Sequence, residues 1–335
     1  MMPACIRVPK REGERVRAEL MAKGILDTGR KIGSDGGYLL IPILTDNFEE
    51  YEVTEAHLET IEHTPTDYRE ALNIPAELGP ELPTAFDVIG DVAIIKLPDP
   101  LLEYRHDIGK ALMSVKRSVR TVMMDSGVKG DLRIRDLEQI AGEGSSETLH
   151  KEFGVRMITD PSKVYFNPRL AAERSRVASL VKEGEIIIDM FAGVAPFGLI
   201  LCKNASPKIV YSIDFNPEAE GFVRRNMDLN KIENIVPITG DAAEVIKDLP
   251  DADRIIMNLP QTADLFLKDA LSRTRIGGTI HLHKVMERSE LGSIKEKMKE
   301  DASGGGFEIS FINTTELKTY SPTMSVYVLD IRRDA

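Results

Sequence analysis

Two patterns of hydrophobic and polar positions divide the chain near residue 166. Before it, short apolar runs such as residues 37–43 and 92–97 are separated by a few helical stretches, whereas from residue 167 onward apolar strands alternate regularly with helical segments. Regular alternation of this kind is typical of a parallel sheet with crossover helices. We therefore predict an α/β domain over residues 167–335, preceded by two smaller α+β domains.

The two smaller domains are separated by a proline-rich stretch. Residues 1–63 combine a helical pattern at 11–23 with β-rich runs, and four prolines then fall among polar and acidic residues within 64–84. Prolines at this density favour an extended connection, so we expect a linker at 64–84. The second domain, residues 85–166, is expected to hold a strand pair at 86–89 and 92–97, a helix over 102–123 and further strands over 148–166.

The strongest chemical signal lies where the α/β pattern begins. An apolar strand ends at Asp189 and runs into a turn of small residues that contains Phe191 and Gly193. Small residues let the backbone approach a ligand, and the following helix presents its amide-rich N-terminus. The turn has too few glycines to admit a pyrophosphate, and an acid at the strand end suits a cation such as a sulfonium amino acid. We therefore expect S-adenosylmethionine as the cofactor.

Two later strands also end in acids. Asp214 lies 25 residues after Asp189, where such folds place a carboxylate for ribose hydroxyls, and Asp241 is suited to accept from an adenine amino group. Each acid could instead be a helix N-cap, but three in register favour a cofactor site. The next strand ends in Asn258-Leu-Pro260, which is similar to the Asn-Pro-Pro element of methyltransferases that act on planar nitrogens. Gln261 stands where an aromatic residue usually completes that element, which weakens the case for an exocyclic amine as target.

A second group of candidate residues precedes the first of these strands. Asn167 and Pro168 are suited to begin a helix, which would place Arg169 and Glu173 four residues apart on one face. A surface ion pair would explain that spacing. A catalytic pair is the alternative, because methylation of guanine N1 requires a base for the N1 proton and a cationic donor for the charge that develops on O6.

Charge and composition exclude several classes of function. The net charge of −11 argues against nucleic acid, yet residues 101–135 carry eight basic residues against four acidic ones. A solvated helix face is the other explanation of that segment. No apolar run is long enough to cross a bilayer, the start lacks the apolar core of a signal peptide, and the two cysteines form no zinc-ligand cluster. We expect a cytoplasmic protein with no membrane and no metal.

Four motifs resemble one known family over essentially the whole chain. Residues 165–174, 189–196, 213–217 and 257–260 together resemble the archaeal and eukaryotic tRNA (guanine37-N1)-methyltransferases. The resemblance implies a class I methyltransferase with a Rossmann-like seven-stranded sheet whose last strand is antiparallel. It also implies that tRNA binds at the anticodon loop and, through the small N-terminal domain, at the outer corner; we expect the protein to be a monomer. One departure is Ala195, where the family often has glycine.

The resemblance also implies roles for individual residues. Glu173 would be the general base, Asn258 would orient the guanine, and Arg169 with an upstream arginine would hold it. Of the two upstream candidates, Arg133 is preferred to Arg135. The cofactor site would comprise Arg174, Asp189, Phe191, Gly193, Asp214, Phe215, Asp241, Ala242 and Asn258, and Tyr165, Arg135 and Pro260 would contact the substrate.

Four other functions are weighed against this one. An aminocarboxypropyl transferase of the wyosine pathway uses the same cofactor, but C7 of a tricyclic base has no N1 proton for Glu173 to remove. A 5-methylcytosine enzyme needs a cysteine nucleophile, whereas Cys202 lies on the helix after the first turn. The turn disfavours an NAD-dependent oxidoreductase, and a non-catalytic tRNA-binding protein would not need the series of acids.

Overall fold

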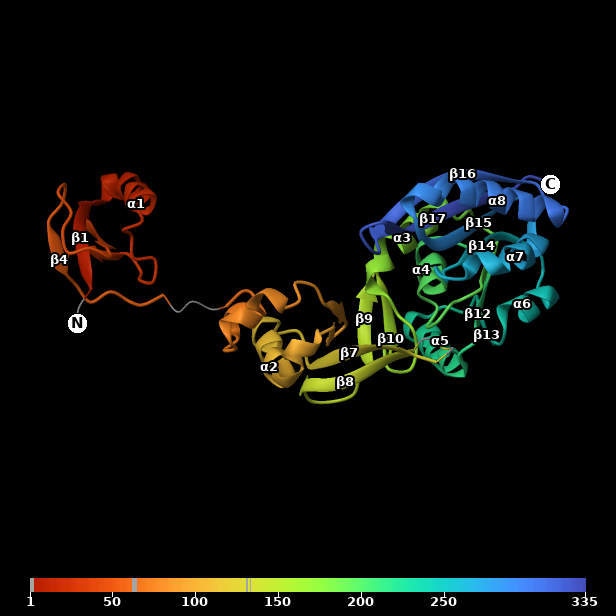
Figure 1. Ribbon diagram of the computed structural model, residues 1–335, viewed down its shortest axis with the longest axis horizontal. Helices are drawn as coiled ribbons and strands as arrows, with labels where there is room; N and C mark the ends of the chain where they lie inside the picture. The colour runs from red at the N-terminus through yellow and green to blue at the C-terminus, as the bar shows by residue number, and fades with distance from the viewer. Residues whose placement is uncertain (1–2, 62–64, 131, 133) are drawn as a thin grey trace. The chain divides into compact units, whose positions relative to one another are not determined.

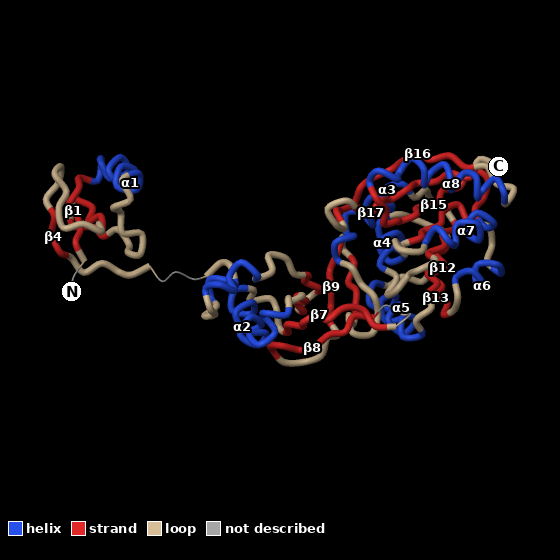
Figure 2. The backbone as a smooth tube through the Cα atoms, in the orientation of Figure 1, coloured by secondary structure: helices blue, strands red, loops and turns tan. Residues whose placement is uncertain are grey.

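The computed structural model describes residues 3–61, 65–130, 132 and 134–335. Their contacts divide the chain into two compact units, Met1–Thr66 and Asp67–Ala335, each of which combines helices and strands (Figures 1 and 2). No helix within the described ranges is long and apolar enough to span a membrane. In the same ranges, no cluster of three or more His, Cys, Asp or Glu side chains could hold a metal ion.

The first unit is one antiparallel sheet covered by one helix. Its strands lie in the order β2-β3-β1-β4, and apolar side chains of β1 pack against α1, as the alternating pattern predicts. The expected helix at 11–23 and strand at 37–43 are confirmed as α1 and β3. The elements are β1 Ala4–Pro9, η1 Lys10–Glu12, α1 Gly13–Ala22, β2 Gly33–Asp35, β3 Tyr38–Pro42 and β4 Val53–Glu55.

The expected linker at 64–84 differs from what its described residues form. Residues 68–71 and 76–81 are 3-10 helices, and Tyr68 and Leu82 are buried in one core with Ile95 and Leu101. The Tyr68 hydroxyl donates to the Pro83 carbonyl at 2.5 Å. Pro75 precedes η3 as its N-cap, and Pro80 lies within this 3-10 helix, so the prolines do not require an extended chain here. The segment is therefore part of the second unit.

The next part of the second unit is a four-stranded sheet. The predicted strand pair is confirmed as β5 and β6, but the helix expected over 102–123 ends at Val115, and Thr121 already begins β7. Val122 pairs with Ala93 of β6, so sheet pairing overrides the helical pattern there. The elements are η2 Tyr68–Ala71, η3 Ala76–Glu81, β5 Asp87–Ile89, β6 Val92–Ile95, η4 Asp99–Tyr104, α2 Arg105–Val115, β7 Thr121–Lys129 and β8 Ile134–Gly142.

A hairpin, β9 and β10, leads into a seven-stranded sheet of order β13-β12-β11-β14-β15-β17-β16. Six strands run in the same direction, and β17 is antiparallel to both of its neighbours, which confirms the predicted α/β sheet with an antiparallel last strand. The strands are β9 Thr148–Glu152, β10 Val155–Thr159, β11 Ile186–Asp189, β12 Ile209–Asp214, β13 Ile235–Thr239, β14 Ala252–Met257, β15 Thr274–Glu287, β16 Ile309–Thr319 and β17 Met324–Arg333.

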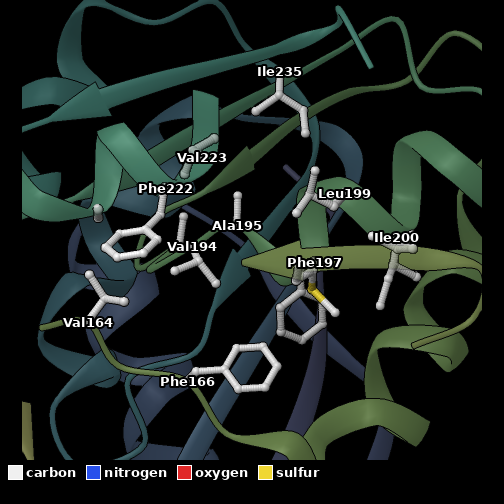
Figure 3. Packing of buried hydrophobic residues seen from close by; sticks show 14 of the residues in the cluster. Val164, Phe166, Val194, Ala195, Phe197, Leu199, Ile200, Phe222, Val223 and Ile235 are labelled. Carbon is white, nitrogen blue, oxygen red and sulfur yellow. The ribbon is translucent and has the colours of Figure 1, made fainter. Parts of the chain in front are cut away.

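Helices cover both faces of this sheet. Successive residues of β11 point to opposite faces, so Ile187 packs with one cluster and Ile188 with the other. Figure 3 shows the first cluster, in which Phe166 and Phe197 lie close together. The helices are η5 Pro168–Leu170, α3 Ala171–Leu180, α4 Pro196–Asn204, α5 Pro217–Asn230, α6 Ala242–Val245, η6 Ile246–Asp248, η7 Ala263–Phe266, α7 Leu267–Arg273, η8 Arg288–Glu290 and α8 Leu291–Gly304.

Candidate active site

A cavity of about 410 Å³ lies at the carboxyl ends of the parallel strands. Its walls include the segments 190–193 after β11, 214–216 after β12, 240–242 after β13 and 258–261 after β14. Parallel strands bring their carboxyl ends to one edge of the sheet, which is where ligands bind in such folds. The four segments singled out in the sequence therefore meet in one space.

The conformation of the turn after β11 is fixed by a hydrogen bond to the acid at the end of β12. Asp214 Oδ2 accepts from the Gly193 amide at 2.6 Å, and Oδ1 accepts from the Asn216 amide at 2.9 Å. Gly193 has a φ of +55°, and a Cβ there would lie 2.9 Å from the Tyr165 carbonyl oxygen. Glycine is thus needed at this position for both conformation and space. Ala195, two residues on, also has a left-handed backbone (φ 56°), where glycine would be less strained.

Asp189 is the most unusual acid of the cavity region. Its side chain is buried, Oδ1 accepts from the Phe191 amide at 3.4 Å, and Oδ2 has no hydrogen-bond partner among the described residues. Burial raises the pKa of Asp189 to about 7, and the charge of Asp214 adds to the effect. A buried carboxylate oxygen without a partner is suited to a cationic ligand.

The third acid serves two purposes. Asp241 Oδ1 accepts from the Ala243 amide at 2.9 Å and so caps the N-terminus of α6, as the N-cap alternative predicted. The same residue also lines the cavity. Phe215 lines the same wall, with its side chain 62% exposed. An exposed aromatic ring beside two carboxylates can stack on a flat base while the acids accept its hydrogen bonds.

The remaining lining residues are partly predicted and partly unpredicted. Tyr165, Asn258 and Pro260, which were singled out in the sequence, line the cavity. His283 of β15 and Lys318 of β16 line it too, together with Tyr320, which follows β16. The sequence showed these strands but no motif within them, so only the order of the sheet brings them here.

Of the arginines proposed to hold the base, the two described ones, Arg169 and Arg135, do not line the cavity. Asp87 of β5 accepts from Arg169 Nε at 2.7 Å and from Arg135 Nη2 at 3.2 Å. Burial lowers the pKa of nearby Lys318, and Arg169 lowers it further, so three cations gather around Asp87. Arg133 lies outside the described residues.

Glu173 is paired differently from the sequence expectation. Both of its carboxylate oxygens accept from Arg176 at 2.7 Å, so the expected pair with Arg169 is not formed. Arg176 also donates to Asp330 of β17 at 2.8 and 3.1 Å, and His281 contacts the same Asp330 at 2.6 Å. Glu173 is buried, and its Oε1 lies 3.9 Å from Nε2 of His283. The i, i+3 spacing of Glu173 and Arg176 was the available sequence signal for this pair.

Comparisons with known proteins agree with this arrangement. Family models match as the tRNA methyltransferase 5 N-terminal domain (residues 5–52), the TYW2 N-terminal domain (68–145) and the TRM5/TYW2 methyltransferase domain (148–309). The chain is 42% identical to the tRNA (guanine(37)-N(1))-methyltransferase Trm5b of Pyrococcus abyssi, over 99% of both chains. The chain belongs to the tRNA (guanine37-N1)-methyltransferase family.

Solved structures of this family extend the match to the fold. The crystal structure of Trm5b from P. abyssi covers 100% of both chains with a TM-score of 0.83 and 40% identity. A complex of aTrm5 and tRNALeu covers 98% of this chain and 99% of that one with a TM-score of 0.81 and 32% identity. An aminocarboxypropyltransferase of Methanocaldococcus jannaschii is more distant, with 30% identity over 74% of this chain and 97% of its own.

Within this tRNA (guanine37-N1)-methyltransferase fold, Arg174 forms a buried ion pair outside the cavity. It was expected at the cofactor, but its side chain is 1% exposed and does not line the cavity. It donates to both carboxylate oxygens of Glu152 at 2.9 and 2.8 Å and to the Asn167 carbonyl at 3.2 Å. This buried pair ties α3 to the hairpin strand β9.

Proposed function

We propose that this protein transfers a methyl group from S-adenosylmethionine to N1 of guanosine 37 in tRNA. The observation that carries the proposal is that Asp214, Asp241 and the Asn258-Leu-Pro260 turn line the same cavity. The relative from P. abyssi that bears this activity in its name matches the chain over 99% of its length.

The walls of the cavity fit the cofactor. Asp214 would accept from the ribose hydroxyls, Asp241 from the adenine amino group, and Phe215 would stack on the adenine. Asp189 does not line the cavity, but it directly precedes the lining segment 190–193, and its unpaired carboxylate would attract the positive end of the molecule from there. S-adenosylmethionine supplies a methyl carbon activated by a sulfonium.

The binding of S-adenosylmethionine should weaken as the pH falls below about 7. In the free protein the pKa of Asp189 is raised to about 7, so the carboxyl is protonated below that pH and must lose its proton to meet a cation. The affinity should then fall by up to about tenfold for each pH unit below 7. Calorimetric titration from pH 5.5 to 8 measures this dependence.

Asp189→Asn is the matched control for that titration. The amide has no proton to lose, so its affinity should be lower at pH 8 and nearly independent of pH. An unchanged slope in this variant would show that another group titrates. Without cofactor, the raised pKa of Asp189 also means that folded-state stability decreases as the pH rises from about 4 to 7.

We assign proton removal and charge stabilisation to residues in and near the cavity. Glu173 would receive the N1 proton, and Asn258 would orient the base edge. Arg169, Arg135 or Arg133 would stabilise the charge on O6; Arg169 and Arg135 would first leave Asp87. The guanine must leave its stack to reach the cavity, and opening an anticodon-loop base requires little energy because that loop is single-stranded.

The tRNA contacts are assigned by region. We place the anticodon loop against the second domain, residues 85–166, where the basic segment spans η4, α2, β7 and the start of β8. The domain formed by residues 1–63 would contact the outer corner of the tRNA, and residues 167–335 would carry out the chemistry. We propose that the protein acts as a monomer in the cytoplasm without a metal.

Nucleoside analysis tests the proposed reaction. The protein is incubated with S-adenosylmethionine and unmodified tRNA that carries guanosine or adenosine at position 37. The tRNA is then digested, and the nucleosides are identified by mass spectrometry. We expect 1-methylguanosine from the first tRNA and no product from the second. Transfer of an aminocarboxypropyl group to a 4-demethylwyosine tRNA, with no 1-methylguanosine, would favour the other branch of the family instead.

A further inference from the structure

His283 is the cavity-lining residue that lies beside Glu173. Glu173 does not line the cavity, and Arg176 occupies both of its carboxylate oxygens. His283 does line the cavity, and its Nε2 is 3.9 Å from Glu173 Oε1. A substrate base in the cavity would therefore meet the imidazole before it met the carboxylate.

The imidazole of His283 has no other structural role in hydrogen bonding. The side chain is fully buried, and within the described part of the chain neither ring nitrogen has a hydrogen-bond partner. The backbone of Met257 is near the ring but does not meet hydrogen-bond geometry. The ring packs edge-on against Phe197, with centroids 6.0 Å apart. Buried polar groups without partners are rare in proteins, and this one borders the space where a ligand would lie.

The groups around His283 keep its ring neutral. Burial lowers the pKa of His283 to about 3, and the neighbouring His281 lowers it further. Arg176 also lowers this pKa and Asp330 raises it, while Glu173 lies on the side of Nε2. A neutral imidazole carries one N–H and one lone pair, which is what a group needs to pass a proton on without holding an extra charge.

We propose that His283 relays the N1 proton of the target guanine to Glu173. This inference rests on the proposed methyl transfer and deepens it. The N1–H bond breaks as Nδ1 of His283 accepts the proton, and the Nε2–H proton passes to Glu173, which becomes a neutral acid. N1 keeps the electron pair, forms the bond to the methyl carbon, and the sulfur–carbon bond breaks with its electrons left on sulfur. Nε2 and Oε1 must approach by about 1 Å to form the hydrogen bond.

His283→Phe tests the relay because it retains the ring that packs on Phe197 and removes both nitrogens. At saturating tRNA and S-adenosylmethionine, the single-turnover rate should fall by about 10²-fold or more. Glu173→Gln should fall to a similar level, and the double variant should be no slower than the slower single variant, because both groups act on one proton. A His283→Phe rate close to that of the wild type, or losses that multiply in the double variant, would overturn the relay.

Further measurements separate the relay from a structural role. When the single-turnover rate of the wild type is measured in mixtures of H₂O and D₂O, its dependence on the deuterium fraction should show that two protons move in the rate-limiting step. The amide of His283→Gln can form hydrogen bonds but cannot pass a proton from one atom to another. This variant should be as slow as His283→Phe, while its thermal midpoint and its affinity for S-adenosylmethionine are retained. A one-proton dependence in the wild type, or a fast His283→Gln enzyme, would contradict the relay.

Two controls complete the design. Glu300→Gln changes an exposed residue of α8 that does not line the cavity, and it should keep the wild-type rate. Formation of 1-methylguanosine by the wild-type protein tests the proposed function separately. If that product is absent, the proposed function fails; if it is formed and His283→Phe is fast, only the relay fails.

Discussion

Glu173→Gln is expected to lower the rate of methyl transfer by about 10²- to 10⁴-fold, which is the usual contribution of a positioned general base. The amide has the same shape as the carboxylate but cannot accept the N1 proton. Arg176 would keep its two bonds to Asp330, so the surrounding structure should change little. Single-turnover assays with guanosine-37 tRNA measure the loss.

Two observations control this experiment. Binding of S-adenosylmethionine should be unaffected, because Glu173 does not line the cavity. Glu183→Gln, in the exposed loop after α3, makes the same chemical change elsewhere and should leave the rate unchanged. Near-normal turnover of Glu173→Gln would remove this residue from the role of proton acceptor.

Glu152→Ala is expected to destabilise the second unit by about 3–5 kcal/mol, because it leaves the guanidinium of Arg174 buried without its carboxylate. Breaking a buried pair from one side costs more than the pair contributes. The double change Glu152→Met with Arg174→Met should therefore recover most of the loss. Urea unfolding followed by circular dichroism gives the free energies of unfolding.

The loss of folding stability at acidic pH should also change in these variants. Burial alone would raise the pKa of Glu152, but His150, 3.6 Å away, and the hydrogen bonds from Arg174 hold it below its ordinary 4.5. A lowered pKa in the folded state contributes stability above about pH 4.5 that is lost as the pH falls further. The double methionine variant should lose less stability than the wild type over that range.

An exposed pair on the same unit is the comparison. Glu147 and Arg225 form two hydrogen bonds of 2.7 and 2.9 Å, but their side chains are 37% and 49% exposed. Glu147→Ala should cost no more than about 1 kcal/mol. A similar loss for both substitutions would show that burial does not decide the strength of the Arg174 pair.

The sheet edge could be predicted because its signals are local. An apolar strand that ends in an acid specifies both the strand and the position of the carboxylate, which is why Asp214 and Asp241 line one cavity, while Asp189 is buried directly before the lining segment 190–193. The left-handed turn at Gly193 is similarly encoded by one residue. The resemblance to a known family then supplied the substrate, which no spacing of residues specifies.

The partners of Glu173 could not be predicted in the same way. From a helical spacing alone, Arg169 and Arg176 are equally good neighbours, and the choice is made by Asp87 and Asp330, which lie far away in the chain. His283 likewise reaches the cavity only through the strand order. The helix expected over 102–123 is shortened for a related reason, because β6 pairs with residues that look helical in isolation.

The position of β17 between β15 and β16 also bears on when the protein becomes competent during its synthesis. Asp330, which holds Arg176 against Glu173, is 154 residues further along the chain than Arg176. The cofactor turns would leave the ribosome before β17 takes its place between β15 and the edge strand β16. A nascent chain that ends before Asp330 would therefore carry the cofactor loops without the carboxylate that holds Arg176 beside Glu173.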